Sequence, residues 1–171
     1  MKFYNISDDY IQYLRDHDST VAINKNESRP YVGALFEIGD IKYFAPLSSP
    51  KEKHKKMKNS KDFRKIDNGK LGAINLNNMI PVIEEALIPL NFDEIDDVKY
   101  RELLRRQYKA VALDEKNILA AATKLHQIVC SDEVSLTAYD RKIKARCCKL
   151  SQLEKLTKSF NTNSKEVEPS T

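Results

Sequence analysis

The strongest local signal in this sequence is a pair of strand-like runs joined by a short turn. Residues 31–38 (YVGALFEI) and 41–47 (IKYFAPL) are rich in β-branched and aromatic side chains, and only Gly39 and Asp40 separate them. A connection of this composition is typical of a tight β-hairpin, because glycine readily adopts the positive φ angles that such turns require. The sequence therefore predicts an antiparallel sheet built around this hairpin.

Signals for helices and further strands surround the hairpin. Short strands are predicted at 2–6 and 71–75, and residues 16–29 show no periodicity, which indicates a loop. Apolar residues at helical spacing predict five helices. Three begin at a capping residue, namely Ser7, Asp114 and Ser151, and Ser151 forms a capping box with Glu154. The other two cover 77–88, with Asn77 or Asn78 as the cap, and 100–113. The predicted fold class is α+β, an antiparallel sheet flanked by several helices.

Two of these helices have a defined apolar stripe. Over 100–113 the stripe is expected to consist of Leu104, Tyr108 and Val111. After Asp114 the residues expected on one face are Ile118, Leu119, Ala122, Leu125 and Val129.

Length and composition are those of one globular domain. With 171 residues, 41% hydrophobic and 32% charged, the chain is long enough to bury a core. We expect a single domain over 1–160 and a flexible tail over 161–171. No run approaches the ~20 apolar residues of a membrane helix, and no secretory signal is recognisable, so we expect a cytoplasmic protein without a membrane partner.

Cysteine and histidine usage gives no sign of a metal or cofactor. The cysteines are Cys130, Cys147 and Cys148, and the histidines are His17, His54 and His126. The cysteines form neither a disulfide framework nor a CxxC zinc pattern, which fits a reducing compartment. The histidines are scattered, and His126, between apolar turns of a helix, is expected to be structural. We therefore predict no metal and no cofactor.

Positive charge is concentrated in one short segment. Residues 51–70 contain nine Lys or Arg and three acids, a balance of +6, whereas the other residues carry 20 bases and 22 acids, a balance of −2. Clustered cations favour a polyanionic partner, because they release condensed counterions on meeting phosphate. A solvated charged loop explains the same pattern. Charge alone leaves both interpretations open.

The residues that follow the hairpin could carry out RNA chemistry. Residues 45–54 (APLSSPKEKH) place two hydroxyls, a lysine and a histidine in one loop. Cleavage of RNA without a metal requires a deprotonated 2′-hydroxyl, a protonated 5′-oxygen and a stabilised phosphorane. These groups could supply all three, but SSP is also a common turn, so the residues by themselves favour a purely structural turn.

Other polar residues also permit two interpretations. Arg29 could clamp a phosphate or form a surface ion pair, and Tyr10 could stack on a base or pack in the core. Gln107 could bind a base edge or be merely exposed. The basic residues of the same helix could face phosphates or solvent; they are Arg105, Arg106 and Lys109. None of these residues identifies a function.

Four blocks, however, occur in an order that resembles a known family. They are MKFYNISDDYIQYL at the start, the strand pair leading into APLSSPK, then LGAINLNNMIPV and YRELLRRQ. Together they resemble the ToxN/AbiQ endoribonuclease toxins of type III toxin–antitoxin and phage abortive-infection systems. The resemblance extends from Met1 to about Leu113, with a weaker similarity in the final helix.

The resemblance implies a strongly bent, barrel-like antiparallel sheet flanked by helices and related to the Kid and MazF toxins. It also implies sequence-specific, metal-independent RNA cleavage that leaves 2′,3′-cyclic phosphate and 5′-hydroxyl ends, often at A-rich sites. The implied partner is a small repeated RNA antitoxin, which the toxin processes into pseudoknots that inhibit it in closed protein–RNA assemblies. The implied role is phage defence or maintenance of a plasmid or genome.

The resemblance also assigns site residues. The family's Thr/Ser-Ser-Pro-Lys element falls on Ser48, Ser49, Pro50 and Lys51, and we expect Ser49 and Lys51 to activate the phosphate and stabilise the transition state. A basic residue before the hairpin is lysine in a relative and Arg29 here. Arginine keeps phosphate binding, but its very high pKa excludes proton transfer, so Arg29 is expected to act as a clamp.

With the resemblance, the other polar residues fit an RNA groove. The residues expected to bind RNA are Tyr10, Tyr31, Lys53, His54, Lys55, Lys56, Lys58, Arg64, Arg105, Arg106 and Gln107. The main alternative is a non-catalytic RNA-binding module that uses the basic loop 51–70. A protein-interaction domain with a solvated loop is a third possibility.

Overall fold

The computed structural model describes residues 1–164 and shows a mixed α+β architecture. Its strands are β1 (Lys2–Ile6), β2 (Tyr31–Ile38), β3 (Ile41–Ser48), β4 (Arg64–Lys65), β5 (Ala73–Ile74), β6 (Ile80–Val82) and β7 (Leu87–Pro89). Its α-helices are α1 (Asp8–His17), α2 (Glu52–Lys56), α3 (Val98–Leu113), α4 (Glu115–Cys130), α5 (Ala138–Ala145) and α6 (Leu150–Ser164). The predicted fold class, an antiparallel sheet with several helices, is confirmed.

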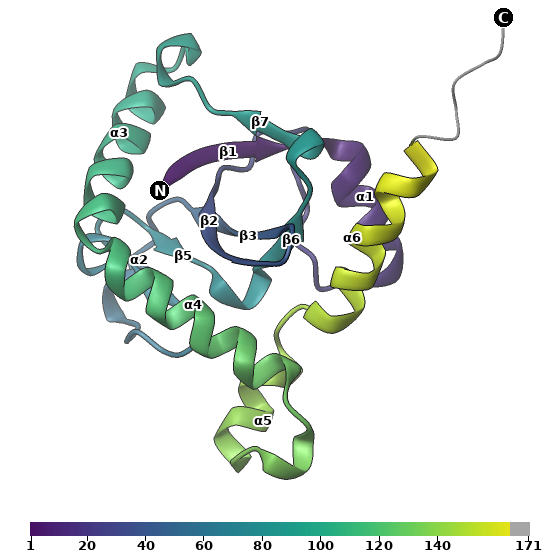
Figure 1. Ribbon diagram of the computed structural model, residues 1–171. Helices are drawn as coiled ribbons and strands as arrows, with labels where there is room; N and C mark the ends of the chain where they lie inside the picture. The colour runs from purple at the N-terminus through teal and green to yellow at the C-terminus, as the bar shows by residue number, and fades with distance from the viewer. Residues whose placement is uncertain (165–171) are drawn as a thin grey trace, which may run out of the picture.

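All strand pairs in the sheet are antiparallel, in the order β4-β5-β3-β2-β1-β7. The long strand β3 has two partners on its far edge, with β6 beside its first half and β5 beside its end. The strands curl round a common interior in Figure 1. Within the described residues β4 and β7 do not pair, so the sheet is bent but not closed into a barrel.

The predicted hairpin is present with its two-residue turn. Ile38 pairs with Ile41 across Gly39 and Asp40, and Gly39 has the positive φ of 58° that such a turn needs. The register between β2 and β3 shifts between Gly33 and Glu37. Such an irregularity bends a strand and increases its twist, which fits the curl of this sheet.

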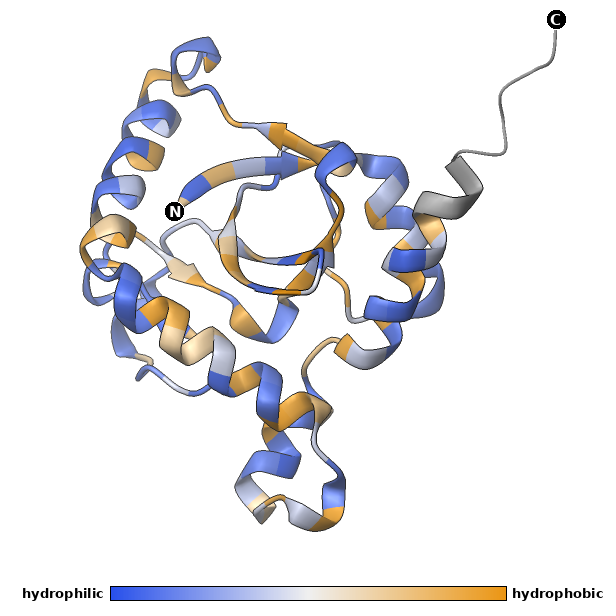
Figure 2. Ribbon diagram, in the orientation of Figure 1, coloured by the Kyte–Doolittle hydropathy of each residue, from blue (hydrophilic) through white to orange (hydrophobic). Residues whose placement is uncertain are grey.

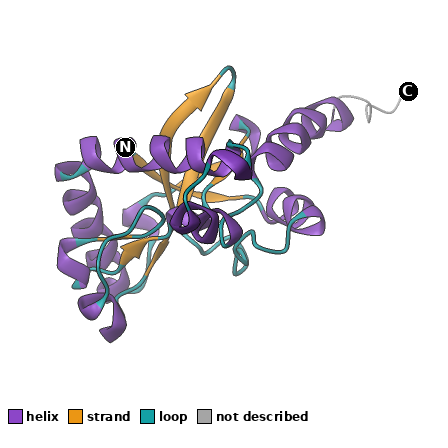
Figure 3. Cartoon of the chain, turned by 90° about the horizontal axis from the view of Figure 1, so that it is seen from below, coloured by secondary structure: helices purple, strands orange, loops and turns teal. Residues whose placement is uncertain are grey.

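Helices lie around the outside of the strands (Figures 1 and 3). In Figure 2 the helices α3, α4 and α6 alternate between hydrophobic and hydrophilic positions along their length, the pattern of amphipathic helices. Buried residues of the sheet and of α1, α3, α4 and α6 form one hydrophobic cluster. The helix-to-sheet contacts therefore close a single core.

The stripe predicted for α4 is largely confirmed, whereas that of α3 is rotated. On α4 the buried residues are Ile118, Ala122, Leu125 and Val129. On α3 Leu104 and Val111 are buried as predicted, but Gln107 takes the place expected for Tyr108, which is exposed. The reason is a hydrogen bond at 2.7 Å from the Gln107 amide to the Leu71 carbonyl, which satisfies the buried polar group.

The helix predicted over 77–88 is wrong. The chain instead forms a 3₁₀ turn over Leu76–Asn78, the strand β6, a second 3₁₀ turn over Glu84–Ala86 and the strand β7. A short apolar run such as residues 79–83 fits a buried strand as well as a buried helix, and its β-branched side chains favour the strand. Pairing of β6 with β3 decides between them.

Several boundaries also differ from the predictions. The short helices α2 and α5 were not predicted, α3 begins at Val98 behind an Asp97 cap, and the strand expected at 71–75 pairs only over β5. Ser7 occupies the N-cap position of α1 without a side-chain cap bond, and Ser151 lies inside α6 rather than capping it. Helix ends depend on such caps and are the least certain part of a prediction.

The C-terminal end is described in part. Helix α6 continues through 161–164, the first residues of the expected tail, and 165–171 lie outside the described residues. None of the helices in the described part of the chain has the length and apolar character needed to cross a membrane.

Candidate functional site

A polar cleft of about 380 Å³ lies where β3 ends. Five residues named from the sequence line it, namely Arg29, Ser48, Ser49, Lys51 and Gln107. Four polar residues that were not predicted join them, namely Lys25, Ser28, Asn75 and Tyr100. The cleft thus gathers side chains from the loop before β2, the end of β3, the segment after β5 and the helix α3.

The end of β3 positions the two hydroxyls and the lysine. Ser48 is the last residue of the strand and pairs with Ala73 of β5, so its backbone is held by the sheet. Ser49 is exposed, and Lys51, also exposed, occupies the N-cap position of α2. Pairing therefore stops directly before Ser49, which leaves the Ser49 and Lys51 side chains free to meet a ligand.

Gly72 allows β5 to approach this strand end closely. Its φ is +93°, and a Cβ at this position would lie 1.9 Å from the Ser48 carbonyl oxygen. A side chain would thus be in severe conflict with the backbone that carries Ser48 and Ser49. Glycine is needed here for both its backbone conformation and its lack of a side chain.

The loop before β2 is held firmly although it has no regular structure. Lys25, Asn26 and Glu27 all have positive φ values between 54° and 58°, which non-glycine residues adopt only when their surroundings hold them there. The start of α1 does so, because the Asp8 carboxylate accepts hydrogen bonds from the Glu27 backbone amide and from the Asn24 side chain. Through this loop the core positions the cations of the cleft.

Arg29 is attached to the same loop. Its Nε donates a hydrogen bond at 2.6 Å to the Ile23 carbonyl, and the Leu47 amide donates at 2.8 Å to the Pro30 carbonyl beside it. The second bond ties the loop to β3. The Nη atoms of Arg29 have no hydrogen bond among the described residues, so the guanidinium retains donors for a bound anion.

Helix α3 forms the opposite wall of the cleft. Gln107 is fixed by its bond to the Leu71 carbonyl, next to Gly72. Tyr100 is half-buried, and burial raises the pKa of its phenol. Since this phenol stays protonated near neutral pH, it can act as a hydrogen-bond donor in the cleft.

The charge of the cleft has one sign. Lys25, Arg29 and Lys51 are cationic, and none of the described residues that line the cleft is acidic. Hydroxyl and amide groups fill the spaces between the cations. An anion with several oxygens, such as a phosphodiester, would meet both positive charge and hydrogen-bond donors here.

The lysines of 53–58 lie on the surface beyond the cleft. Lys53, Lys56 and Lys58 are exposed, and Lys55 pairs with Glu52 at 2.7 Å. They belong to α2 and the residues after it, so the predicted basic loop begins with a short helix. None of them lines the cleft.

His54 contradicts the expectation that it faces RNA. Only 3% of this residue is exposed, its Nδ1 is buried without a hydrogen-bond partner, and its ring packs against Phe63. Burial, with Lys53 and Lys51 nearby, lowers the pKa of the imidazole. His54 is therefore a neutral residue of the interior in this structure.

Tyr10 and Tyr31, expected to stack on bases, are both completely buried. The Tyr10 hydroxyl donates to the Pro81 carbonyl at 2.8 Å and lies 3.0 Å from the Thr157 hydroxyl. Burial raises the pKa of both tyrosines. Because neither ring is exposed, both are core residues in this structure and present no face to a base.

The predicted arginines occupy three different places. Arg64 is paired with Asp114, and Arg105 with both Asp93 and Glu102. Arg106 is exposed and lines a separate hollow of about 540 Å³. Arg64 therefore does not lie with the two arginines of α3, and neither Arg105 nor Arg106 lines the cleft.

Sequence patterns gave little sign of the four unpredicted cleft residues. Lys25 and Ser28 lie in an aperiodic loop. Asn75 follows β5 and Tyr100 lies in the first turn of α3, and the sequence did not predict the ends of these two elements correctly. Proximity in sequence to Arg29 was the only available signal for Lys25 and Ser28. Tertiary packing brings these four residues together.

One group of metal-ligating side chains is found within the described residues, away from the cleft. It consists of His126, Cys130 and Glu154, whose ligand atoms lie within 4.8 Å of one another. None of the three lines the cleft. The sequence did not indicate this group, because Glu154 comes from a different helix.

Fold and cleft together define a class, an α+β protein with a polar, cationic cleft at the end of a bent antiparallel sheet. Residues 2–158 match the sequence model of a family described as toxin ToxN, type III toxin–antitoxin system. The chain belongs to this ToxN family.

Individual relatives agree with the family match. The endoribonuclease ToxN of Pectobacterium atrosepticum is 30% identical over 178 residues, which cover 98% of each chain. A solved toxin structure, from work on selective toxin inhibition by a non-coding RNA pseudoknot, superposes with a TM-score of 0.82 at 31% identity and covers 94% of this chain and 97% of its own. The structure of AbiQ, a lactococcal anti-phage endoribonuclease of a type III system, superposes with a TM-score of 0.76 at 27% identity, covering 94% of this chain and 98% of its own.

Proposed function

We propose that this chain is a metal-independent endoribonuclease toxin that cleaves RNA by attack of the 2′-hydroxyl. The observation that carries the proposal is the cleft itself, which combines Lys25, Arg29 and Lys51 with hydroxyl donors and has no acidic residue among its described lining. A Mg²⁺-dependent nuclease would need carboxylate oxygens at this place. The endoribonuclease activity named for the relatives supports the same function.

The proposed reaction forms one bond and breaks one. The 2′-oxygen attacks phosphorus and loses its proton to solvent water, the bond from phosphorus to the 5′-oxygen breaks, and that oxygen takes up a proton from the Lys51 ammonium, which solvent water then reprotonates. The products are a 2′,3′-cyclic phosphate and a 5′-hydroxyl. The phosphorane carries extra negative charge, so donors aimed at its oxygens lower the barrier.

Each cleft residue has a proposed role. Ser49 donates its hydroxyl hydrogen to a phosphate oxygen, with Ser48 beside it, and Arg29 clamps the phosphate. Lys51 neutralises the phosphorane, and its ammonium group can donate a proton to the 5′-oxygen, which the Arg29 guanidinium cannot do. Gln107 and Tyr100 hold the RNA from the wall formed by α3.

The proposed partner is a small RNA antitoxin of the same system. Its processed pseudoknots occupy the cleft, inhibit the toxin and build a closed protein–RNA assembly. The solved relative from work on inhibition by an RNA pseudoknot supports this proposal. The proposed substrate is cellular or phage RNA, and the proposed compartment is the cytoplasm. We also propose that the bent sheet is related to that of the Kid and MazF toxins.

The test is cleavage of an A-rich RNA in the presence of EDTA. The unmodified chain is expected to leave cyclic phosphate ends, and Ser49→Ala is expected to reduce the rate by about 10²–10³-fold, the usual loss for one donor to a developing oxyanion. Ser151→Ala is the matched control, because Ser151 is exposed on α6 and does not line the cleft. Its rate should equal that of the unmodified chain.

The outcomes separate the alternatives. Full activity of Ser49→Ala would remove the catalytic role of this hydroxyl. Loss of activity in EDTA, restored by Mg²⁺, would overturn metal independence. RNA binding without any cleavage would favour the non-catalytic RNA-binding module, and absence of salt-dependent RNA binding would favour the protein-interaction domain.

A further inference from the structure

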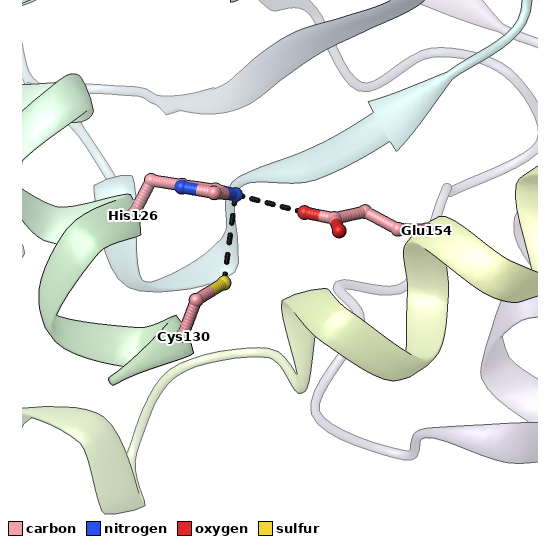
Figure 4. Close-up of side chains that lie close together, drawn as sticks. All are labelled: His126, Cys130 and Glu154. Atoms are coloured by element: carbon pink, nitrogen blue, oxygen red, sulfur yellow. Dashed lines mark hydrogen bonds and ion pairs between the residues drawn. The ribbon is translucent and has the colours of Figure 1, made fainter. Parts of the chain in front are cut away.

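His126, Cys130 and Glu154 converge between two helices (Figure 4). His126 and Cys130 are four residues apart on α4, so they share one face of the helix. Glu154 reaches toward them from α6. The His126 Nε2 lies 2.8 Å from the Glu154 Oε1 and 3.5 Å from the Cys130 Sγ.

The surroundings of the cluster hold these side chains in place. The Tyr43 hydroxyl donates a hydrogen bond to the same Glu154 oxygen. Phe36 stacks on Tyr43 at 4.4 Å between ring centroids and meets the His126 ring edge-on at 5.2 Å. The side chains of His126 and Glu154 are only 15% and 24% exposed, whereas Cys130 is open to solvent. A ligand can therefore enter past the thiol into a partly desolvated site.

We propose that His126, Cys130 and Glu154 bind one Zn²⁺-like divalent cation, which ties α4 to α6. Imidazole, thiolate and carboxylate are the three ligand types that Zn²⁺ takes in proteins. Metal binding expels the Cys130 thiol proton to solvent and replaces the His126 hydrogen bonds with coordinate bonds. A water molecule fills the fourth tetrahedral position.

The three ligand atoms lie within 4.8 Å of one another, and the two distances that involve His126 are close to those of such a site. Zinc bonds of about 2.0–2.3 Å at tetrahedral angles place ligand atoms roughly 3.3–3.6 Å apart. The distance between the His126 and Cys130 ligand atoms, 3.5 Å, already fits. The distance between His126 and Glu154, 2.8 Å, opens to this range by a small rotation of the glutamate side chain. Tyr43 then supports the ligating carboxylate, as outer-shell hydrogen bonds do in known zinc sites.

The role of this cation is to cross-link helices. Helix α3, which forms a wall of the proposed RNA cleft, and helix α6 lie on opposite sides of the sheet in Figure 1. A cation that joins α4 to α6 raises the stability of the fold. Because none of its three ligands lines the cleft, its removal by EDTA leaves RNA cleavage intact at temperatures well below unfolding.

The test uses the purified full chain, freed of metal, with ZnCl₂ and CoCl₂ as probes. Calorimetric titration is expected to give one Zn²⁺ per chain, and Co²⁺ to give a thiolate-to-cobalt charge-transfer band. Loss of an outer-shell residue usually weakens metal binding by about 10–100-fold. Loss of a direct ligand should weaken Zn²⁺ binding by more than this, in each of the variants Cys130→Ser, His126→Asn and Glu154→Gln. Tyr43→Phe should weaken it by about 10–100-fold.

Matched controls exclude general surface binding. His17→Asn removes an exposed histidine on α1, and Glu133→Gln an exposed carboxylate, so both should bind Zn²⁺ like the unmodified chain. Absence of binding by the unmodified chain, or full binding by Cys130→Ser, would overturn the proposal. In either case the cluster is a hydrogen-bonded contact between helices and no more.

A second measurement does not depend on the folding of any variant. Cys130 is exposed, whereas Cys147 and Cys148 are buried. Zn²⁺ should therefore slow alkylation of Cys130 in the unmodified chain by at least about 10-fold, followed by peptide mass spectrometry, because a coordinated thiolate is a poorer nucleophile. An unchanged alkylation rate at saturating Zn²⁺ would contradict the proposal.

Discussion

At the scale of single residues, Gly72 and Gln107 shape the proposed active cleft without carrying out chemistry. Gly72 lets β5 lie against the Ser48 carbonyl, and Gln107 attaches α3 to the Leu71 carbonyl one residue earlier. These neighbouring anchors set the distance between the strand end with Ser49 and the helix opposite. The geometry of the cleft thus depends on the contacts that these two residues make within the protein.

Gly72→Ala tests this dependence. The substitution places a Cβ in severe conflict with the Ser48 carbonyl and forces alanine into a positive φ, so the free energy of unfolding should fall by about 1–3 kcal/mol. The strand end must also shift, so RNA cleavage should fall together with stability. Urea denaturation and the EDTA cleavage assay measure the two effects.

Gly39→Ala is the control, because Gly39 also has a positive φ but a Cβ added there would meet no atom within 4 Å. It should lose stability through backbone conformation and keep RNA cleavage. Equal activity of the two variants would show that close packing at Gly72 does not set the cleft.

At the scale of secondary-structure elements, ion pairs tie the small helix α5 to the segment after α2. The Asp62 carboxylate is buried and accepts hydrogen bonds from Arg146, at the end of α5, and from Ser60. Lys61 pairs with Asp140 at 2.6 Å. Because α5 has few buried apolar residues, these polar contacts hold it in place.

We expect Arg146→Met to lower the free energy of unfolding by about 1–2 kcal/mol at pH 7, since it leaves a buried carboxylate without its cation. Water screens the pair because Arg146 is 55% exposed, which keeps the value small. Lys142→Met on the same helix, at an exposed position, is the control and should be neutral.

The pH dependence of this effect follows from the Asp62 carboxyl. Burial opposes its ionisation, but the hydrogen bonds from Arg146 and Ser60 outweigh burial, and the pKa lies below its ordinary value. A lowered folded-state pKa gives stability above the unfolded value of about 4, and this stability is lost as the pH falls through the folded value. The difference between the unmodified chain and Arg146→Met should therefore shrink below pH 4, and a constant difference would contradict the assignment.

At the scale of the whole molecule, the charge distribution separates the cleft from a wider cationic surface. The net charge is +4, yet residues 51–70 alone carry +6. Within this segment Lys51 reaches the cleft, whereas Lys53, Lys56 and Lys58 are exposed beside it. This surface should attract RNA of any sequence, while the cleft acts on the bound phosphate.

Replacing Lys53, Lys56 and Lys58 together by Gln should weaken binding of single-stranded RNA and lower the slope of log affinity against log salt by about 2, at roughly 0.7 per lost contact. Fluorescence anisotropy in a Ser49→Ala background measures binding without cleavage. The control replaces the exposed Lys116, Lys142 and Lys158, which changes net charge equally. Equal losses in both triple variants would show that net charge, and not this surface, attracts RNA.

Local chemistry was sufficient to predict several parts of this protein. The hairpin, the stripe on α4 and the position of Ser49 and Lys51 directly after a strand all follow from neighbouring residues, because turn geometry and side-chain periodicity act over a few positions. Five of the nine polar residues that line the cleft were named from the sequence, but the resemblance to the family, and not local chemistry, assigned them to a site.

The remaining features depend on contacts between residues that are distant in sequence. The segment predicted as a helix over 77–88 instead contains β6 and the start of β7, because β6 pairs with β3 and β7 pairs with β1. His54 and Tyr10 became interior residues because other elements cover them. Gln107 faces the cleft because its amide meets a carbonyl 36 positions away, and Glu154 joins His126 across 28 positions. Periodicity carries no information about such partners, since packing of the whole chain selects them.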